Sequence, residues 1–116
     1  MANCVACHQA NGEGLPGLYP ALADSEWLRG PESRIVRILL NGLSGPMTVR
    51  GARFDSVMPA FRDLLTDEEI AAVLTFARAS WNNGASAVPA QTVGSVRKQT
   101  FNRAGNWTAA ELASIP

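Results

Sequence analysis

The residues best suited to chemistry are concentrated in the segment Cys4-Val5-Ala6-Cys7-His8. The chain has two cysteines and one histidine in all, and all three lie in this segment. Two thiols separated by two residues and followed at once by histidine form the pattern for covalent attachment of a c-type haem. Each cysteine would form a thioether with a haem vinyl group, and His8 would offer a neutral imidazole nitrogen to the iron. We therefore predict one covalent haem c, held by Cys4, Cys7 and His8.

The second axial ligand of the iron must come from another side chain or be absent. Because the chain has no second histidine, methionine and lysine are the candidates. Met58 precedes Pro59, which favours an extended backbone that could lie over a flat cofactor. Met47 lies in a similar glycine-flanked loop and is the rival, whereas Met1 is too close to the motif to reach the other haem face. We expect Met58 to bind the iron opposite His8; the alternative for any methionine is core filler.

Composition bounds the class of protein. The chain has 116 residues, of which 47% are hydrophobic, enough for one globular core. No apolar run approaches the roughly 20 residues that a membrane-spanning helix needs. The formal net charge is +0, which gives no electrostatic case for binding nucleic acid. No signal peptide is visible, but haem attachment of this type takes place on the oxidising side of a membrane. We therefore expect a periplasmic protein whose targeting signal was removed or lies upstream.

Helical patterns surround the candidate ligands. Residues 31–41 predict a helix, with Pro31 at its first position and Gly42 as its stop. Residues 66–81 predict the clearest helix, because Thr66 and Glu69 form a capping box before an apolar stripe. In the tail, residues 89–100 predict a further helix, and a second capping box at Thr108 predicts a very short one. Residues 9–30 and 42–65 are rich in glycine and proline and predict irregular loops, with a short hairpin at 48–54.

At this point the chain resembles the class I c-type cytochromes. The shared elements are the Cys4–His8 motif, Pro20-Ala21-Leu22, and Val57-Met58-Pro59 before a capped helix. The resemblance implies an all-α fold with helices around one haem and long loops. It also implies that the Pro20 carbonyl accepts a hydrogen bond from His8, fixing the imidazole, while Leu22 packs on the ring. Pro16 is the rival for that carbonyl, and the alternative for both prolines is loop stiffening.

More narrowly, the chain is similar to bacterial cytochrome c domains that occur alone or fused to periplasmic oxidoreductases. These include quinoprotein dehydrogenases and haem-containing copper nitrite reductases. The similarity lies in residues 41–46, 58–61 and 65–76, and it extends over residues 2–84. In that group position 47 is usually aliphatic, which favours Met58 as the ligand. The tail matches loosely, chiefly in residues 106–112.

The resemblance suggests how the chain is divided. We expect residues 1–84 to form the haem domain and residues 85–116 to form a C-terminal extension that packs on it. The family has a helix before the first cysteine, but only Met1-Ala2-Asn3 precede Cys4 here. We therefore expect a fold without its N-terminal helix, derived from a longer parent, with the tail helping to cover the 66–81 helix.

Aromatic and basic residues complete the predicted site. Trp27 could line the haem edge and donate its indole N–H to a propionate. Phe61 and Tyr19 are candidates for packing on the ring. The propionates could also pair with arginines, for which the candidates are Arg34, Arg37, Arg50 and Arg53. The simpler interpretation of each is a packing aromatic or a solvated charge.

Four functions compete. The leading hypothesis is an electron carrier that is not an enzyme, serving periplasmic redox partners. The second is a redox domain severed from a multidomain oxidoreductase of the copper nitrite reductase or quinoprotein dehydrogenase type. The third, a gas sensor or small peroxidase, would need an open iron site and therefore a Met58 that does not bind. The fourth is a haem-free thiol–disulfide module, which the scarcity of strand signals disfavours.

Covalent haem attachment has a direct test. The purified, acid-denatured protein should retain its haem, and a pyridine haemochrome spectrum should report one haem c per chain, because thioether bonds survive denaturation. Replacement of both Cys4 and Cys7 by serine should release the haem into organic solvent. A native protein that gives no haemochrome would favour the thiol–disulfide module instead.

Overall fold

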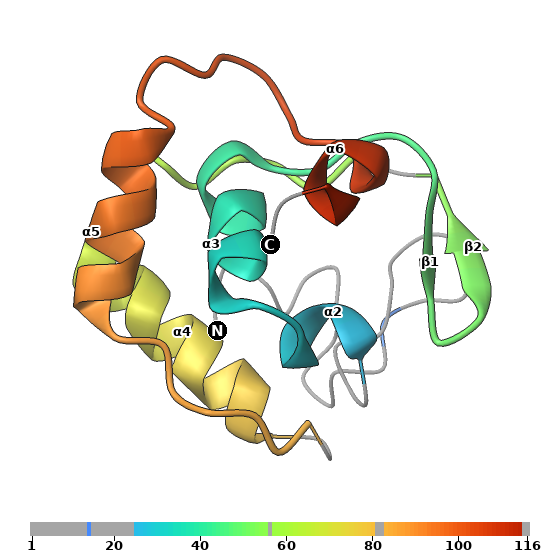
Figure 1. Ribbon diagram of the computed structural model, residues 1–116, viewed down its shortest axis with the longest axis horizontal. Coiled ribbons are helices and arrows are strands. Elements are labelled where there is room, and N and C mark those ends of the chain that lie inside the picture. Colours follow the sequence, from blue (N-terminus) through green and yellow to red (C-terminus); the bar gives the residue numbers. More distant parts are fainter. Residues whose placement is uncertain (1–13, 15–24, 56, 81–82, 115–116) are drawn as a thin grey trace.

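The computed structural model describes residues 14, 25–55, 57–80 and 83–114. These residues form a mostly helical fold with one two-stranded hairpin. The elements are α2 (Glu26–Arg29), α3 (Glu32–Asn41), β1 (Met47–Val49), β2 (Ala52–Phe54), α4 (Asp67–Ala79), α5 (Ala90–Gln99) and α6 (Ala109–Ala113). Figure 1 shows α3 near the centre, α4 and α5 together on one side of it, and the hairpin on the opposite side. None of the helices in the described stretches is long and apolar enough to cross a bilayer.

The central helix α3 forms where the sequence predicted it. Its last backbone bond runs from the Gly42 N–H to the Ile38 carbonyl at 2.7 Å, and Gly42 has a φ of +79°, which favours glycine. One detail differs from the prediction. Pro31 precedes the helix rather than occupying its first position, because its ψ of 137° is extended. Most of α3 is buried, so the helix packs against neighbours on several sides.

The helix α4 begins with the predicted capping box. The Thr66 hydroxyl accepts the Glu69 N–H at 3.1 Å, and the Glu69 carboxylate accepts the Thr66 N–H at 2.9 Å. The two bonds satisfy backbone donors that a helix start leaves without partners. The capping box therefore fixes where the chain turns from the loop carrying Met58 into α4.

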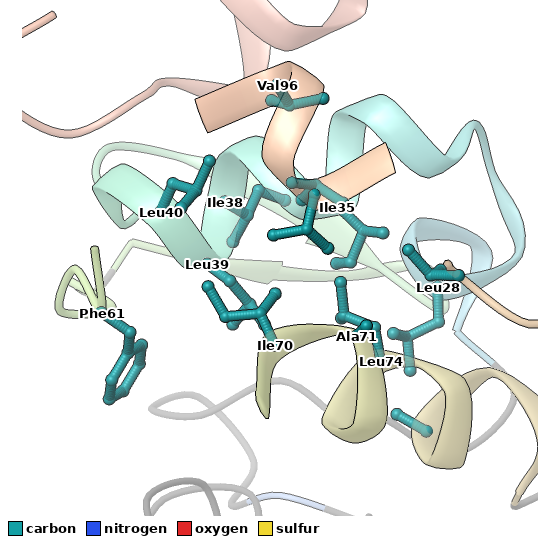
Figure 2. Close-up of a cluster of buried hydrophobic side chains, with 14 of the residues drawn as sticks. Leu28, Ile35, Ile38, Leu39, Leu40, Phe61, Ile70, Ala71, Leu74 and Val96 are labelled. Atoms are coloured by element: carbon teal, nitrogen blue, oxygen red, sulfur yellow. The ribbon is translucent and has the colours of Figure 1, made fainter. Parts of the chain in front are cut away.

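Helices α3, α4 and α5 share one core. Ile70, Ala71 and Leu74 of α4 lie against the apolar face of α3, as Figure 2 shows. Val93 and Val96 of α5 belong to the same buried cluster. Burial of one such aliphatic side chain contributes about 1.5–3 kcal/mol. The predicted helix of the tail is thus part of the core, although a domain boundary at residue 84 stays a prediction.

The prediction of an irregular loop over residues 9–30 is wrong at its end, where α2 forms. The Ser25 hydroxyl caps this helix by accepting the Trp27 N–H at 3.2 Å. Glu26 stands in the first turn and Arg29 in the last, as the helix dipole favours. A single turn is too short to show an apolar periodicity, which explains why the pattern missed it. The remainder of 9–24, apart from Gly14, lies outside the described residues.

The predicted hairpin forms between β1 and β2, with Met47 paired to Phe54 and Val49 to Ala52. Its turn residues Arg50 and Gly51 have φ values of +53° and +78°, which is the geometry of a two-residue type I′ turn. A positive φ is unfavourable for arginine. The Arg50 N–H, however, donates to the Glu26 carboxylate at 2.9 Å. The hairpin turn is therefore tied to α2.

Arg78 is a buried cation in α4, with 4% of its surface exposed. Its guanidinium donates to the carbonyls of Leu28 and Gly30, each at 2.9 Å, and to the Ser86 carbonyl at 2.8 Å. It thereby joins α4 to the end of α2 and to the segment that precedes α5. Buried carbonyls without donors are costly, so this side chain stabilises the connection between the three segments.

Replacement of Arg78 by methionine keeps an unbranched apolar stem but leaves those carbonyls without donors. We expect the free energy of unfolding of Arg78→Met to fall by about 2–4 kcal/mol. The control is Arg53→Met on the exposed face of β2, which should change it by less than about 0.5 kcal/mol. Denaturant titration of both variants measures the difference, and equal losses would contradict this role of Arg78.

Candidate functional site

The predicted site residues divide into two groups. Trp27, Met58 and Phe61 belong to the described part of the chain. The remaining predicted residues lie outside it: Cys4, Cys7, His8, Pro20 and Leu22, together with the rival Pro16 and with Tyr19. The geometry of the site is therefore built from the first group and from the elements that hold it.

Met58 lies in an extended segment between β2 and α4. Its N–H donates to the Leu43 carbonyl at 2.8 Å, and its carbonyl accepts the Leu43 N–H at 3.1 Å. The side chain of Met58 packs on the edge of the buried core, whereas Val57 is 64% exposed and Pro59 is also exposed. This alternation is that of a strand with one face inward. The backbone is extended here, as the pre-proline position predicted, and it directs the Met58 side chain toward the core.

Gly42 allows this close pairing. A Cβ at this position would collide with the Met58 carbonyl oxygen and with the side-chain amide of Asn106. The sequence identified Gly42 only as the stop of a helix. Its second role, the close approach of the segment that carries Met58, has no local signal, because it depends on residues far along the chain.

Phe61 lies three residues after Met58 and is held by the end of α3. Its N–H donates to the Leu39 carbonyl at 2.9 Å, and the following Arg62 N–H donates to the Leu40 carbonyl at 3.1 Å. The ring is 6% exposed and lies at the edge of the cluster in Figure 2, away from Leu40. The last turn of α3 thus fixes the chain at Phe61 and Arg62, shortly after Met58.

The predicted hydrogen bond from Trp27 to a haem propionate is not available in this conformation. The indole Nε1–H of Trp27 instead donates to the Thr48 carbonyl at 2.9 Å. The guanidinium carbon of Arg34 lies 4.6 Å from the centre of the indole ring. The ring remains partly buried beside the core, so a role as an apolar wall for the haem stays a prediction.

The side chains of Arg34 and Arg37 have protein partners. The Arg34 guanidinium donates to the Glu26 carbonyl at 3.4 Å, and that of Arg37 donates to Gln99 Oε1 at 3.2 Å. Burial lowers the pKa of Arg37. Burial also lowers the pKa of Arg62, and the nearby charge of Arg97 lowers it further. Contact between any of the candidate arginines and a propionate stays a prediction.

The donor atoms in this region suit haem iron. Within residues 14, 25–55, 57–80 and 83–114, no three His, Cys, Asp or Glu side chains gather as a metal cluster. The sulfur donors of these stretches are Met47 and Met58, both at the edge of the core. A thioether is a soft ligand that binds haem iron and is unsuited to hard cations such as Mg²⁺ or Ca²⁺. These two thioethers therefore have the chemistry to bind haem iron, and ligation by Met58 stays a prediction.

Known proteins resemble this chain in sequence. A sequence model of the family described as Cytochrome c matches residues 1–81. Cytochrome c-552 of Thermus thermophilus is 42% identical over 86 residues, which cover 71% of this chain and 65% of that protein. The gluconate 2-dehydrogenase cytochrome c subunit of Pantoea cypripedii is 40% identical over 102 residues, which cover 83% of this chain and 22% of the subunit. The cytochrome c subunit of alcohol dehydrogenase (quinone) from Gluconobacter oxydans is 31% identical over 87 residues, 73% of this chain and 18% of the subunit.

The chain belongs to the cytochrome c family. It is a class I mono-haem domain that carries one covalent haem c and transfers electrons, which confirms the resemblance and the predicted cofactor. The chain spans less than two thirds of the length of these relatives. The family match assigns no second axial ligand and names no partner.

The closeness of Gly42 to Met58 can be tested with two glycines of similar conformation. Gly42 and Gly51 have φ values of +79° and +78°, but a Cβ at Gly51 would meet nothing within 4 Å. We expect Gly51→Ala to cost about 1 kcal/mol of stability through backbone strain alone. Gly42→Ala should cost about 2 kcal/mol more, because the Met58 segment must move. Denaturant titration measures the stability of both variants. Equal losses of unfolding free energy would show that the Gly42 backbone does not pack tightly against the Met58 segment.

Proposed function

We propose that this domain is a one-electron carrier whose iron is bound by His8 on one side and Met58 on the other. The observation that carries the proposal is the pair of backbone hydrogen bonds between Met58 and Leu43, which hold the thioether inward from an otherwise exposed loop. A ligand fixed by the backbone needs little rearrangement when the iron changes its charge. Such a site favours rapid electron transfer over binding of a substrate.

Each residue has a defined task in this proposal. When bound, the haem supplies the exchange of one electron between ferric and ferrous iron. Cys4 and Cys7 hold it covalently, and His8 is the proximal ligand. Met58 closes the opposite face to small molecules, and its thioether raises the reduction potential. Phe61 supplies apolar packing, which also favours the less charged ferrous state.

Pro20, Leu22 and Trp27 would support that arrangement. The Pro20 carbonyl would accept a hydrogen bond from His8, which fixes the imidazole for binding the iron. Leu22 would pack on the haem ring. The indole ring of Trp27, whose N–H is bonded to Thr48, would act as an apolar wall.

Met58 is preferred to Met47 as the ligand. Met47 begins β1 and pairs with Phe54, so its place is explained by the apolar face of the hairpin. Among the described residues, the segment around Met58 is not a strand of the hairpin and forms only an isolated bridge with Leu43. The resemblance of Val57-Met58-Pro59 to the family pattern supports the same choice.

The domain would not be an enzyme by itself, and it would exchange electrons with a periplasmic redox protein. The second candidate is a domain of a larger oxidoreductase. This chain corresponds to 22% and 18% of two relatives that are named as cytochrome c subunits of dehydrogenases. Those relatives favour a dehydrogenase over a copper nitrite reductase as the larger enzyme. Coding sequence for a catalytic domain in the same reading frame would decide between the carrier and the fused domain.

The ligand assignment is tested with Met58→Ala and the matched variant Met47→Leu. Met58→Ala should lose the far-red absorption band of methionine-bound ferric haem and should bind carbon monoxide readily in the ferrous form. Its reduction potential should fall by an amount on the order of 0.1 V, because axial ligands tune haem potentials over about 0.8 V. Met47→Leu conserves volume and should keep the band and the potential. Loss of the band in Met47→Leu, with retention in Met58→Ala, would reverse the assignment.

A further inference from the structure

Three segments that are distant in the sequence meet at Leu43. Leu43 forms an antiparallel bridge with Met58 on one side and a parallel bridge with Trp107 on the other. The Trp107 N–H donates to the Gly42 carbonyl at 3.0 Å, and the Trp107 carbonyl accepts the Ser44 N–H at 2.9 Å. The segment that holds Met58 is therefore itself held by the C-terminal part of the chain. In Figure 1 this part runs from α5 past the end of α3 to α6.

Side chains strengthen this connection. The Asn106 side-chain amide donates to the Asn41 carbonyl at 2.8 Å. The Asn41 side-chain amide donates in turn to the Arg103 carbonyl at 3.2 Å. The Arg62 guanidinium donates to Asn41 Oδ1 at 2.8 Å, from a position shortly after Met58. Asn41, at the end of α3, thus joins the C-terminal part of the chain to Arg62 in the loop after Met58.

Arg103 organises the C-terminal side of the contact. Its guanidinium carbon lies 3.7 Å from the centre of the Trp107 ring, and the group donates to the Asn106 carbonyl at 2.6 Å. It also donates to both carboxylate oxygens of Glu111, at 2.9 and 3.1 Å. The hydrogen bond from Arg103 lowers the pKa of Glu111, and one from the Thr108 backbone lowers it further. One side chain therefore fixes Asn106 and Trp107 relative to α6.

We propose that residues 103–111 position the Met58 thioether at the haem iron, with Arg103, Asn106 and Trp107 as positioning residues. This proposal rests on the proposed ligation by Met58. The cytochrome c family model matches residues 1–81, so residues 103–111 lie beyond the matched region. Without it, the Leu43 backbone loses a neighbour, and the Met58 segment leaves the iron more often.

A purely structural role would act differently. Any substitution that lowers global stability by the same amount would then have the same effect on the iron site. Thr75 provides the matched control, because its hydroxyl accepts the Val88 N–H at 3.0 Å and donates to the Val88 carbonyl at 3.3 Å. Thr75→Val removes both bonds, which join α4 to the segment before α5 and do not involve the Met58 segment.

The experiment uses the haem-loaded protein and two measurements. The first is the affinity of the ferric protein for added imidazole, which binds only when Met58 has left the iron. The second is hydrogen exchange at the Leu43 and Met58 amides, which can be measured whichever ligand the iron has. Arg103→Met and Asn106→Ala should each raise the imidazole affinity about tenfold, because apparent affinity scales with the open fraction. Exchange at both amides should quicken by a similar factor.

The controls separate the possible results. Thr75→Val should lower the unfolding midpoint and leave imidazole affinity unchanged. Arg103→Lys should fall between the wild type and Arg103→Met, because lysine keeps the charge near Glu111 but loses the planar stacking and paired hydrogen bonds. Asn106→Ala removes a smaller group and keeps the test informative if Arg103→Met does not fold.

The proposal is overturned if Arg103→Met and Asn106→Ala change imidazole affinity no more than Thr75→Val does. Faster amide exchange with unchanged imidazole affinity would likewise overturn it, since the contact would then hold the backbone without affecting the ligand. Failure of the ligand assignment looks different. In that case the wild type already binds imidazole as tightly as Met58→Ala, while amide exchange still reports whether residues 103–111 hold residue 58.

Discussion

The end of α3 imposes the constraint on which the rest of the described structure depends. The last four carbonyls of any helix lack partners within the helix. Here each accepts a hydrogen bond from a different donor: Ile38 from the Gly42 N–H, Leu39 from the Phe61 N–H, Leu40 from the Arg62 N–H and Asn41 from the Asn106 side chain. Leaving one such buried carbonyl without a donor would cost about 1–3 kcal/mol. The loop after Met58 and the C-terminal segment are therefore brought to the same place.

The candidate site follows from this arrangement. Met58 lies between Leu43 and the stretch that bonds to the last turn of α3, so its backbone is fixed on both sides. Trp27 and the hairpin form a second unit, joined by the indole N–H of Trp27 and by the bond from Arg50 to Glu26. The core of α3, α4 and α5 supports both units. The place of the Met58 side chain is thus set by hydrogen bonds of the backbone that carries it, because the side chain itself is flexible.

The parts of the fold governed by local rules could be predicted from the sequence. Capping boxes located the starts of α4 and α6, and the Arg50-Gly51 turn located the hairpin. The motif at Cys4, Cys7 and His8 predicted the cofactor, which the family match supports. The single turn of α2 was missed, since four residues carry no periodicity.

Long-range contacts could not be predicted from the sequence in the same way. Asn41 and Asn106 are separated by 65 positions, and no local pattern records that they meet. The sequence suggested a propionate as a partner for the indole N–H of Trp27. It could not reveal the Thr48 carbonyl, which is 21 positions away and comes close only when the hairpin folds back on α2. The double role of Gly42 was hidden for the same reason: the residues that crowd it come from two other segments.

The stacking of Arg103 on Trp107 has a thermodynamic consequence under the proposed ligation. Coupling between two events is reciprocal, so whatever free energy the C-terminal segment gives to the iron–thioether bond, the bond returns to the docking of that segment. A thioether favours ferrous over ferric iron. Reduction of the iron would then also strengthen the docking of the C-terminal segment on the end of α3. The stability of that segment would depend on the oxidation state of the iron.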